Sequence, residues 1–417
     1  MSTEATTIDD LACPRFTPMV ESMRAFMVRT ASPHLEPSAL MDTAMAETGL
    51  SDFGDPSFHE PLAVLCESLA KDVSLSPFGQ VYAWNQISRL LMNRLLVEDL
   101  VRTDPSILDI SIERPIVIAG MPRSGTTHLH NLLSADPALR SMPFWEANEP
   151  VPPPQERRVR ARRDPRLDRA KQVVGMLNTC MPRLRQMHEM TVGHRPEEIH
   201  LLALAFSTLY FETWAGGLPT YRDWYRSADQ TFAYRYLRKV LQVLTRLRGG
   251  SRWVLKSPQH LELFEPLSTV FPDATVVVTH RDPYSVATSF ATMHAYTARM
   301  YLDKVDVARV GAYWADRTRH MLAACTGTRD LPAPERSIDV RFAALVADNL
   351  AVAEAVYERA GQPFTDVARE QLAAYVAAHP PGRHGRVAYD RGILGTDDGW
   401  GETFAAYIRR FGVEEET

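Results

Sequence analysis

Residues 115–127 read Pro-Ile-Val-Ile-Ala-Gly-Met-Pro-Arg-Ser-Gly-Thr-Thr, a short β-branched run that leads into a glycine-containing loop. The residues after Pro115 suit a buried strand, and the leucines that follow the loop recur at helical spacing. The stretch therefore predicts a strand, a tight turn and a helix that opens at Thr126-Thr127. Backbone N–H groups and the helix dipole would then point at an anion, as in phosphate-binding loops.

The loop differs from a nucleoside-triphosphate phosphate loop at one decisive position. From Gly120 the spacing is G-x-x-x-x-G-T-T, so Thr126 stands where that motif requires lysine, and Arg123 lies inside the loop. A loop that keeps the backbone cradle but moves the charge still binds phosphate, without having to handle a β/γ-phosphate with magnesium. The alternative is a βα turn in which glycine and serine serve only the backbone.

Composition places the chain among ordinary globular proteins. Its 417 residues, 45% hydrophobic and 23% charged, suffice for one large α/β domain with an appended region, or for two domains. A net charge of −5 predicts no general attraction to nucleic acid, so any anion site must be local. The scattered cysteines form no C-x-x-C pair, and neither a signal peptide nor a membrane span is evident, which favours a cytoplasmic protein.

The predicted fold class is α/β, with a central parallel sheet. Two further strands are expected at 252–256 and 274–280, and each precedes helix signals, which indicates helical crossovers. Leucine spacing predicts a mainly helical N-terminal extension at 1–112, packed on an α/β domain at 113–417. Within that domain, 157–230 is expected to be a helical insertion, either a lid or an acceptor region. Its apolar part, 197–214, is predicted to be a core helix.

Charged residues follow each predicted strand, where ligands gather on parallel sheets. Arg123, Lys256 and Arg281 lie just past the three strand ends. Ser289 follows Arg281 by about two helical turns, so these two side chains could hold one further phosphate through bidentate and hydroxyl contacts.

Gly-Met-Pro-Arg-Ser-Gly-Thr-Thr followed by strand-Arg-x7-Ser resembles the two phosphosulfate-binding elements of the sulfotransferases that use 3′-phosphoadenosine 5′-phosphosulfate (PAPS). The resemblance extends over roughly residues 115–410, and the chain looks most like the large bacterial group with a helical N-terminal extension. It implies a P-loop-type three-layer core. It also implies in-line transfer of a sulfuryl group from PAPS to a hydroxyl, with release of adenosine 3′,5′-bisphosphate (PAP) and no required metal.

The resemblance also assigns roles to residues. By this resemblance, the residues that bind the 5′-phosphosulfate are Arg123, Ser124, Gly125, Thr126 and Thr127. The residues that bind the 3′-phosphate are Arg281 and Ser289. Arg383 and Arg386, in a basic loop, are candidates to close over the same phosphate. Arg123 would neutralise the bridging oxygen as it leaves, and Lys256 would contact the transferring group. The acidic pair usual in the family's late strand is Ala343-Ala344 here, which leaves contacts to the cofactor base from that element open.

The general base that removes the acceptor proton has two candidates. Glu146 follows the loop's helix by a distance similar to the catalytic glutamate of tyrosylprotein-type sulfotransferases. His260 lies four residues past Lys256, near where animal cytosolic members place a histidine. A helix-capping Glu146 and a satisfied surface His260 are the structural alternatives. Glu197-Glu198, which follow a proline, are interpreted first as capping chemistry.

The acceptor is expected to be a small, fairly apolar alcohol, phenol or lipid-like metabolite, because aromatic residues gather at 144–145 and 206–225. An ATP-dependent small-molecule kinase of P-loop type and a non-catalytic nucleotide-binding protein are the alternatives. Thr126 in place of the loop lysine speaks against the kinase. No oligomeric state is indicated.

Overall fold

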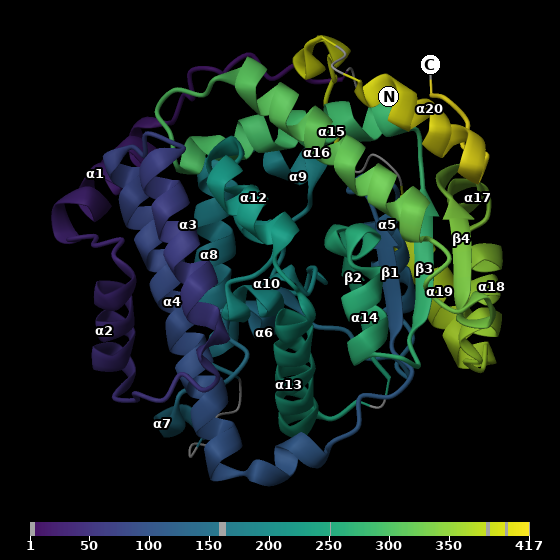
Figure 1. Ribbon diagram of the computed structural model, residues 1–417, viewed down its shortest axis with the longest axis horizontal. Helices are drawn as coiled ribbons and strands as arrows, with labels where there is room; N and C mark the ends of the chain where they lie inside the picture. Colours follow the sequence, from purple (N-terminus) through teal and green to yellow (C-terminus); the bar gives the residue numbers. More distant parts are fainter. Residues whose placement is uncertain (1–4, 158–163, 251, 381–383, 397–398, 417) are drawn as a thin grey trace.

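A four-stranded parallel sheet forms the centre of the protein (Figure 1). The computed structural model describes residues 5–157, 164–250, 252–380, 384–396 and 399–416. The strands are β1 (Ile116–Gly120), β2 (Val254–Ser257), β3 (Thr275–His280) and β4 (Ser337–Arg341), in the order β2-β1-β3-β4. All neighbouring pairs are parallel. The α/β class and the strands expected at 252–256 and 274–280 are confirmed.

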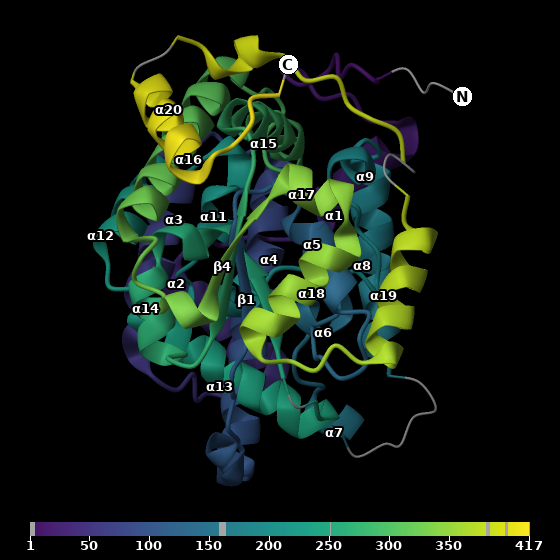
Figure 2. The same cartoon turned by 90° about the vertical axis from the view of Figure 1, so that its right-hand side faces the viewer.

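Alternate strand residues face opposite sides of the sheet and create two hydrophobic layers. Ile116 and Ile118 join a buried cluster with α5 (Thr126–Leu133), α17 (Phe342–Ala347), α18 (Asn349–Ala360) and α19 (Asp366–Ala378). Val117 and Ala119 join the larger cluster on the other face, with α13 (Thr231–Arg248), α14 (Phe264–Val270), α15 (Pro283–Thr297) and α16 (Val307–Thr328). Figure 2 shows β4 between α18 and α19 on one side and α14 and α16 on the other. The core is therefore three-layered.

The chain before the sheet is helical. It forms α1 (Pro18–Thr30), α2 (Pro37–Thr48), α3 (His59–Lys71) and α4 (Pro77–Thr103). In α3, Leu62, Leu65 and Leu69 are buried at the spacing that predicts an apolar helix face. Side chains of these helices belong to the same buried cluster as one face of the sheet. Figure 1 shows α1 to α4 gathered on one flank of the molecule.

Short helices connect α5 to β2 and fill much of the region between the N-terminal helices and the sheet. They are α6 (Phe144–Asn148), α7 (Pro154–Arg157), α8 (Arg166–Cys180), α9 (Leu184–Met187), α10 (Ile199–Leu202), α11 (Leu209–Glu212) and α12 (Pro219–Ser227). The 3-10 segments of the chain are η1 (Pro56–Phe58), η2 (Pro105–Asp109), η3 (Ala203–Ala205), η4 (Trp214–Gly216), η5 (Pro258–Glu262), η6 (Ala298–Met300), η7 (Pro334–Arg336) and η8 (Arg391–Leu394). The last helix, α20 (Trp400–Phe411), packs on α16. Over the described ranges, no helix combines the length and apolarity needed to cross a membrane.

The prediction that 197–214 forms one continuous core helix is wrong. The segment is buried, but it breaks at Phe206, whose φ of 56° is left-handed. Directly after the break, the Ser207 hydroxyl donates to Gln230 at 2.6 Å and the Thr208 hydroxyl donates to Gln259 at 2.8 Å. Buried hydroxyls that find such partners compete with a continuous helix.

Candidate active site

The glycine loop after β1 has the conformation of an anion cradle. Gly125 precedes α5 with a φ of 88°, and Arg123 has a left-handed φ of 72°, which is strained for a residue with a side chain. The backbone bonds nearest the helix start run from Ser124 N–H to Met121 at 3.2 Å and from Leu129 N–H to Gly125 at 2.9 Å. Within the described ranges, the N–H groups of 125–128 have no protein acceptor. They are therefore available to an anion.

A cavity of about 910 Å³ opens in front of this loop. Its wall includes Arg123, Gly125, Thr126 and Thr127 of the loop, and Arg281 after β3. The same cavity continues between aromatic and aliphatic side chains of α4, α8, α11 and α15. One space thus joins a phosphate-binding end to an apolar end.

Arg281 connects the two predicted phosphate elements. Its NH1 group donates to the carbonyl of Arg123 at 2.6 Å. Its Nε and NH2 groups donate to the two carboxylate oxygens of Glu416, each at 2.5 Å. This bidentate geometry is the one that guanidinium groups use for carboxylate and phosphate. The Glu416 carboxylate therefore binds the Arg281 guanidinium, which is the group predicted to bind the 3′-phosphate.

Of the other loop residues predicted to bind the phosphosulfate, Arg123 lines the cavity and Ser124 does not. The Arg123 guanidinium lines the cavity and donates to the carbonyl of Met187, while its Nε is buried without a hydrogen-bond partner in the described part of the chain. The Ser124 hydroxyl bonds Met121 and the Thr279 hydroxyl, both at 2.6 Å. Ser124 thus fastens the loop to β3 and does not face the cavity.

The second phosphate element and the basic loop are only partly assembled. Ser289 lies in α15, buried and outside the cavity wall, and its hydroxyl finds no hydrogen-bond partner among the described residues. Arg386 is exposed and lines the cavity. Arg383, the other candidate clamp, lies outside the described residues.

A buried ion pair stands where β2 meets the loop. The Lys256 ammonium donates to Glu197 Oε1 at 2.5 Å and to the Thr127 hydroxyl at 3.4 Å. Glu197 and Thr127 line the cavity, whereas Lys256 is fully buried directly behind them. The side chain of Glu197 is 17% exposed, so this carboxylate faces both the lysine and the cavity.

His260, one predicted base, is enclosed in the protein interior. The ring is fully buried, its Nδ1 bonds the Tyr234 hydroxyl at 2.6 Å, and its Nε2 bonds Glu198. Glu198 also accepts from the backbone N–H of Lys256 at 2.6 Å. Both ring nitrogens are therefore occupied away from the cavity. Glu198 is the N-cap residue of α10, as the capping interpretation expects, but its carboxylate makes no cap hydrogen bond and binds His260 and the Lys256 N–H instead.

Glu146, the first-choice base, also lies outside the cavity wall. It is fully buried in α6 and forms ion pairs with Arg140 at 2.8 Å and with Arg248 at 3.0 Å. The Arg140 guanidinium in turn stacks over the Trp253 ring at 4.6 Å. A buried carboxylate that is held by two arginines and does not line the cavity favours a structural role.

Three histidines that the spacing of the sequence did not group together line the cavity: His188, His194 and His200. Burial lowers the pKa of His188 and of His200 to about 4, and nearby cationic groups add to the effect. Burial also holds the pKa of His194 well below its ordinary value. These rings are therefore neutral near physiological pH, and their basicity is weak.

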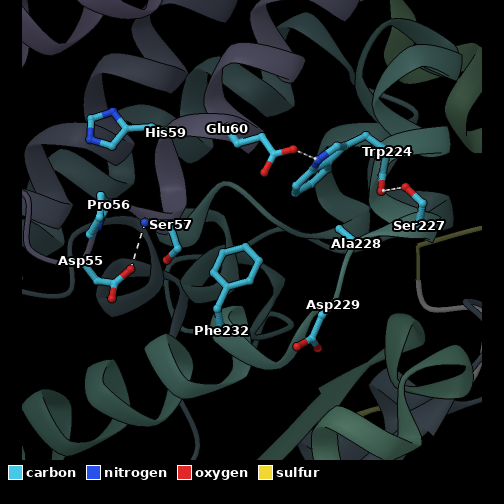
Figure 3. Close-up of a pocket in the computed structure, with 10 residues that line it drawn as sticks. All are labelled: Asp55, Pro56, Ser57, His59, Glu60, Trp224, Ser227, Ala228, Asp229 and Phe232. Carbon is cyan, nitrogen blue, oxygen red and sulfur yellow. Dashed lines mark hydrogen bonds between the residues drawn. The ribbon is translucent and has the colours of Figure 1, made fainter.

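A second pocket lies away from this site, between α3 and α12 (Figure 3). Its polar groups already bond one another or the backbone. Glu60 accepts from the Trp224 indole at 3.0 Å, Asp55 accepts from the Ser57 N–H at 2.9 Å, and the Ser227 hydroxyl donates to the carbonyl of Trp224 at 2.9 Å. We assign no ligand to it.

Comparison with known proteins agrees with the fold. The sequence profile of the sulfotransferase family matches residues 115–366. The sulfotransferase STF9 from Mycobacterium avium is 27% identical, with a TM-score of 0.79, over 91% of this chain and 97% of that one. The sulfotransferase STF1 from Mycobacterium tuberculosis H37Rv is also 27% identical, with a TM-score of 0.74, over 90% and 97%. No curated protein sequence matches the chain.

Proposed function

This chain belongs to the sulfotransferase family, and from that premise we propose that it transfers the sulfuryl group of PAPS to the hydroxyl of a small, largely apolar acceptor and releases PAP. One observation carries the proposal. The loop after β1, Glu197 with its partner Lys256 near the end of β2, and Arg281 after β3 converge at one end of a single cavity. Three anion-binding elements at adjacent strand ends suit a donor that carries a phosphosulfate and a second phosphate.

The polar groups around the loop fit such a donor. Free N–H groups at 125–128 would hold the 5′-phosphosulfate, and Arg281 the 3′-phosphate. Arg123 lines the cavity, and its Nε is a buried polar atom without a partner among the described residues. Buried polar atoms are rarely left unsatisfied unless a ligand or water completes them. The donor would supply the sulfuryl group, and the protein would supply the positive charge that receives the leaving phosphate.

We assign the general base to Glu197 in place of Glu146 or His260. Glu197 faces the cavity beside the loop, whereas the other two are enclosed by their own partners. Burial lowers the pKa of His188 and of His200 to about 4, which is too low for efficient proton abstraction. An anion bound at the loop would draw the Lys256 ammonium toward it and free the Glu197 carboxylate to accept the acceptor's proton.

Ligand-dependent melting tests the donor assignment. PAP is expected to raise the melting temperature by a few degrees at concentrations well above its Kd, since ligand at about a hundred times Kd contributes about 2.7 kcal/mol. Adenosine 5′-monophosphate, which lacks the 3′-phosphate, should stabilise far less. Stronger stabilisation by ATP with magnesium, together with ATP turnover, would support the kinase alternative. PAP binding without any transfer from PAPS would support the non-catalytic one.

The Glu416 contact leads to a second expectation. Glu416→Gln should tighten PAP binding by up to about fivefold, because the carboxylate competes with phosphate for a partly exposed Arg281. Isothermal titration calorimetry at low and high salt measures this, and the gain should shrink as salt screens the pair. Glu415→Gln is the matched control, since it removes an equal charge from an exposed neighbour. An equal gain in both variants would show a general charge effect only.

A further inference from the structure

The cavity extends from the phosphate loop to an apolar chamber. Aromatic and aliphatic side chains from α4, α8, α11 and α15 and the segments beside them form its wall: Tyr82, Leu177, Met181, Tyr210, Trp214 and Phe290. Figure 1 shows α4 across the molecule from α5, with α6, α8 and α10 between them. The chamber therefore has room for the body of an apolar acceptor at a distance from the donor end.

One cation lies in the wall of this chamber. Arg89 of α4 donates from NH1 to the carbonyl of Asn148 at 2.8 Å and from NH2 to Gln86 Oε1 at 2.9 Å. Both acceptors are neutral, and no carboxylate of the described chain lies within 4.0 Å of the guanidinium. Glu149, the carboxylate that influences its pKa, is held by Arg169 at 2.6 Å. Arg89 is half-buried by surface exposure, and burial lowers its pKa, as expected for a cation that has lost part of its hydration without a counterion.

A purely structural role does not account for this arginine. The carbonyl of Asn148 already accepts from the Asn93 side chain at 2.8 Å, so it would stay satisfied without Arg89. Even partial burial of an unpaired charge is costly, and such groups are normally paired or ligand-bound. Of the other described arginines in the cavity wall, Arg123 and Arg281 belong to the donor end, and Arg185 and Arg386 are exposed.

His200 links the two ends of the cavity. Its ring centroid lies 5.0 Å from that of Tyr210, in the apolar chamber. Its pKa is influenced by Arg89 and by Glu197, so both groups lie within electrostatic range of one imidazole. A molecule that passes His200 could therefore present one end to Glu197 and the other to Arg89.

We propose that Arg89 anchors an anionic group of the acceptor, so that the acceptor is a lipophilic hydroxy acid with its hydroxyl at Glu197 and its carboxylate or a similar monoanion at Arg89. This inference rests on the proposed function for the role of the hydroxyl end. The anchor itself rests on the uncompensated guanidinium in an apolar wall. The acceptor then has a defined direction, because only its neutral hydroxyl end suits the donor side.

Calorimetric binding of matched probes tests the anchor. The probes are ω-hydroxy fatty acids of increasing chain length and their methyl esters, titrated with and without saturating PAP. The wild-type protein is expected to bind at least one acid more tightly than its ester, by about tenfold to a hundredfold, as for a hydrogen bond to a charged group. Arg89→Gln should reduce that ratio to near unity, and Arg89→Lys should retain part of it. Arg185→Gln, which removes an exposed arginine from the same cavity, should leave the ratio unchanged.

The outcomes separate this inference from the proposed function. Equal binding of acids and esters, a preference that survives Arg89→Gln, or no binding of any probe would overturn the anchor. Thermal melting and the retained charge of Arg89→Lys guard against a folding defect in the glutamine variant. An Arg89-dependent preference for acids without PAP binding or transfer would leave the anchor standing while the proposed function fails. Transfer from PAPS with no such preference would do the reverse.

Discussion

Lys256→Met is expected to lower kcat for sulfuryl transfer by about a hundredfold to a thousandfold, the cost of removing one preorganised charge-stabilising donor. Lys256 is fully buried at the end of β2, with its ammonium between Glu197 and the Thr127 hydroxyl of the loop. Negative charge develops on the transferring group and its leaving oxygen during the reaction. The Lys256 ammonium would stabilise this charge in a site screened from water. Methionine keeps most of the volume, so the loss is electrostatic.

Steady-state kinetics with PAPS and a probe acceptor measure the effect. The Kd of PAP should change by only a few fold, because the loop N–H groups and Arg281 bind the nucleotide, whereas an interaction made in the transition state appears in kcat. Lys239→Met is the matched control, since Lys239 pairs with Glu98 at 3.0 Å and does not line the cavity. A Lys256→Met variant with near-normal kcat would refute a role for this lysine in transfer.

Glu197→Gln is expected to lower kcat by about a hundredfold to ten-thousandfold, the range for loss of a positioned general base. Glutamine can still bond Lys256 but cannot accept the acceptor's proton. The difference in kcat between the wild-type protein and Glu197→Gln should be smaller for acidic phenols, because their hydroxyls ionise more readily without a base. Comparing kcat across phenols of graded acidity would show this convergence.

Glu146→Gln makes the same chemical change at the base that sequence reasoning favoured. It should cost about 2–3 kcal/mol of folding free energy, because it leaves Arg140 and the partly exposed Arg248 without their shared carboxylate, and should alter kcat little. Denaturant unfolding and kinetics on the same preparations separate the two effects. Loss of transfer in a stably folded Glu146→Gln variant, with activity retained in Glu197→Gln, would reverse the assignment.

Much of the fold can be read from short stretches of the chain. The short apolar runs before Arg123, Lys256 and Arg281, which are rich in β-branched or aromatic residues, predict three strands. All three are present and parallel. The glycine loop and the helix after it follow from residues that act on one another within a few positions. Because parallel strands present their carboxyl ends at one edge, convergence of these three cations also follows from the order of strands and helices.

The exception within the fold has a long-range cause. The apolar run at 197–214 predicts one helix, yet it breaks at Phe206 because Ser207 and Thr208 bond Gln230 and Gln259. These partners lie far along the chain, so no local pattern announces them. Propensity gives way here to tertiary hydrogen bonds.

The loop, its missing lysine and the strand-end cations are local features. They were enough to identify the family and to predict an anion-binding end of the site. Which carboxylate faces the acceptor is not local. Glu146 and Glu197 both stand beside helix starts, but Arg140 and Arg248 enclose the first, and Lys256 draws the second to the cavity wall. Arg140 is near Glu146 in the sequence, but packing brings Arg248 and Lys256 to these carboxylates from distant segments. Only the folded chain therefore distinguishes a buried structural carboxylate from one that meets a substrate.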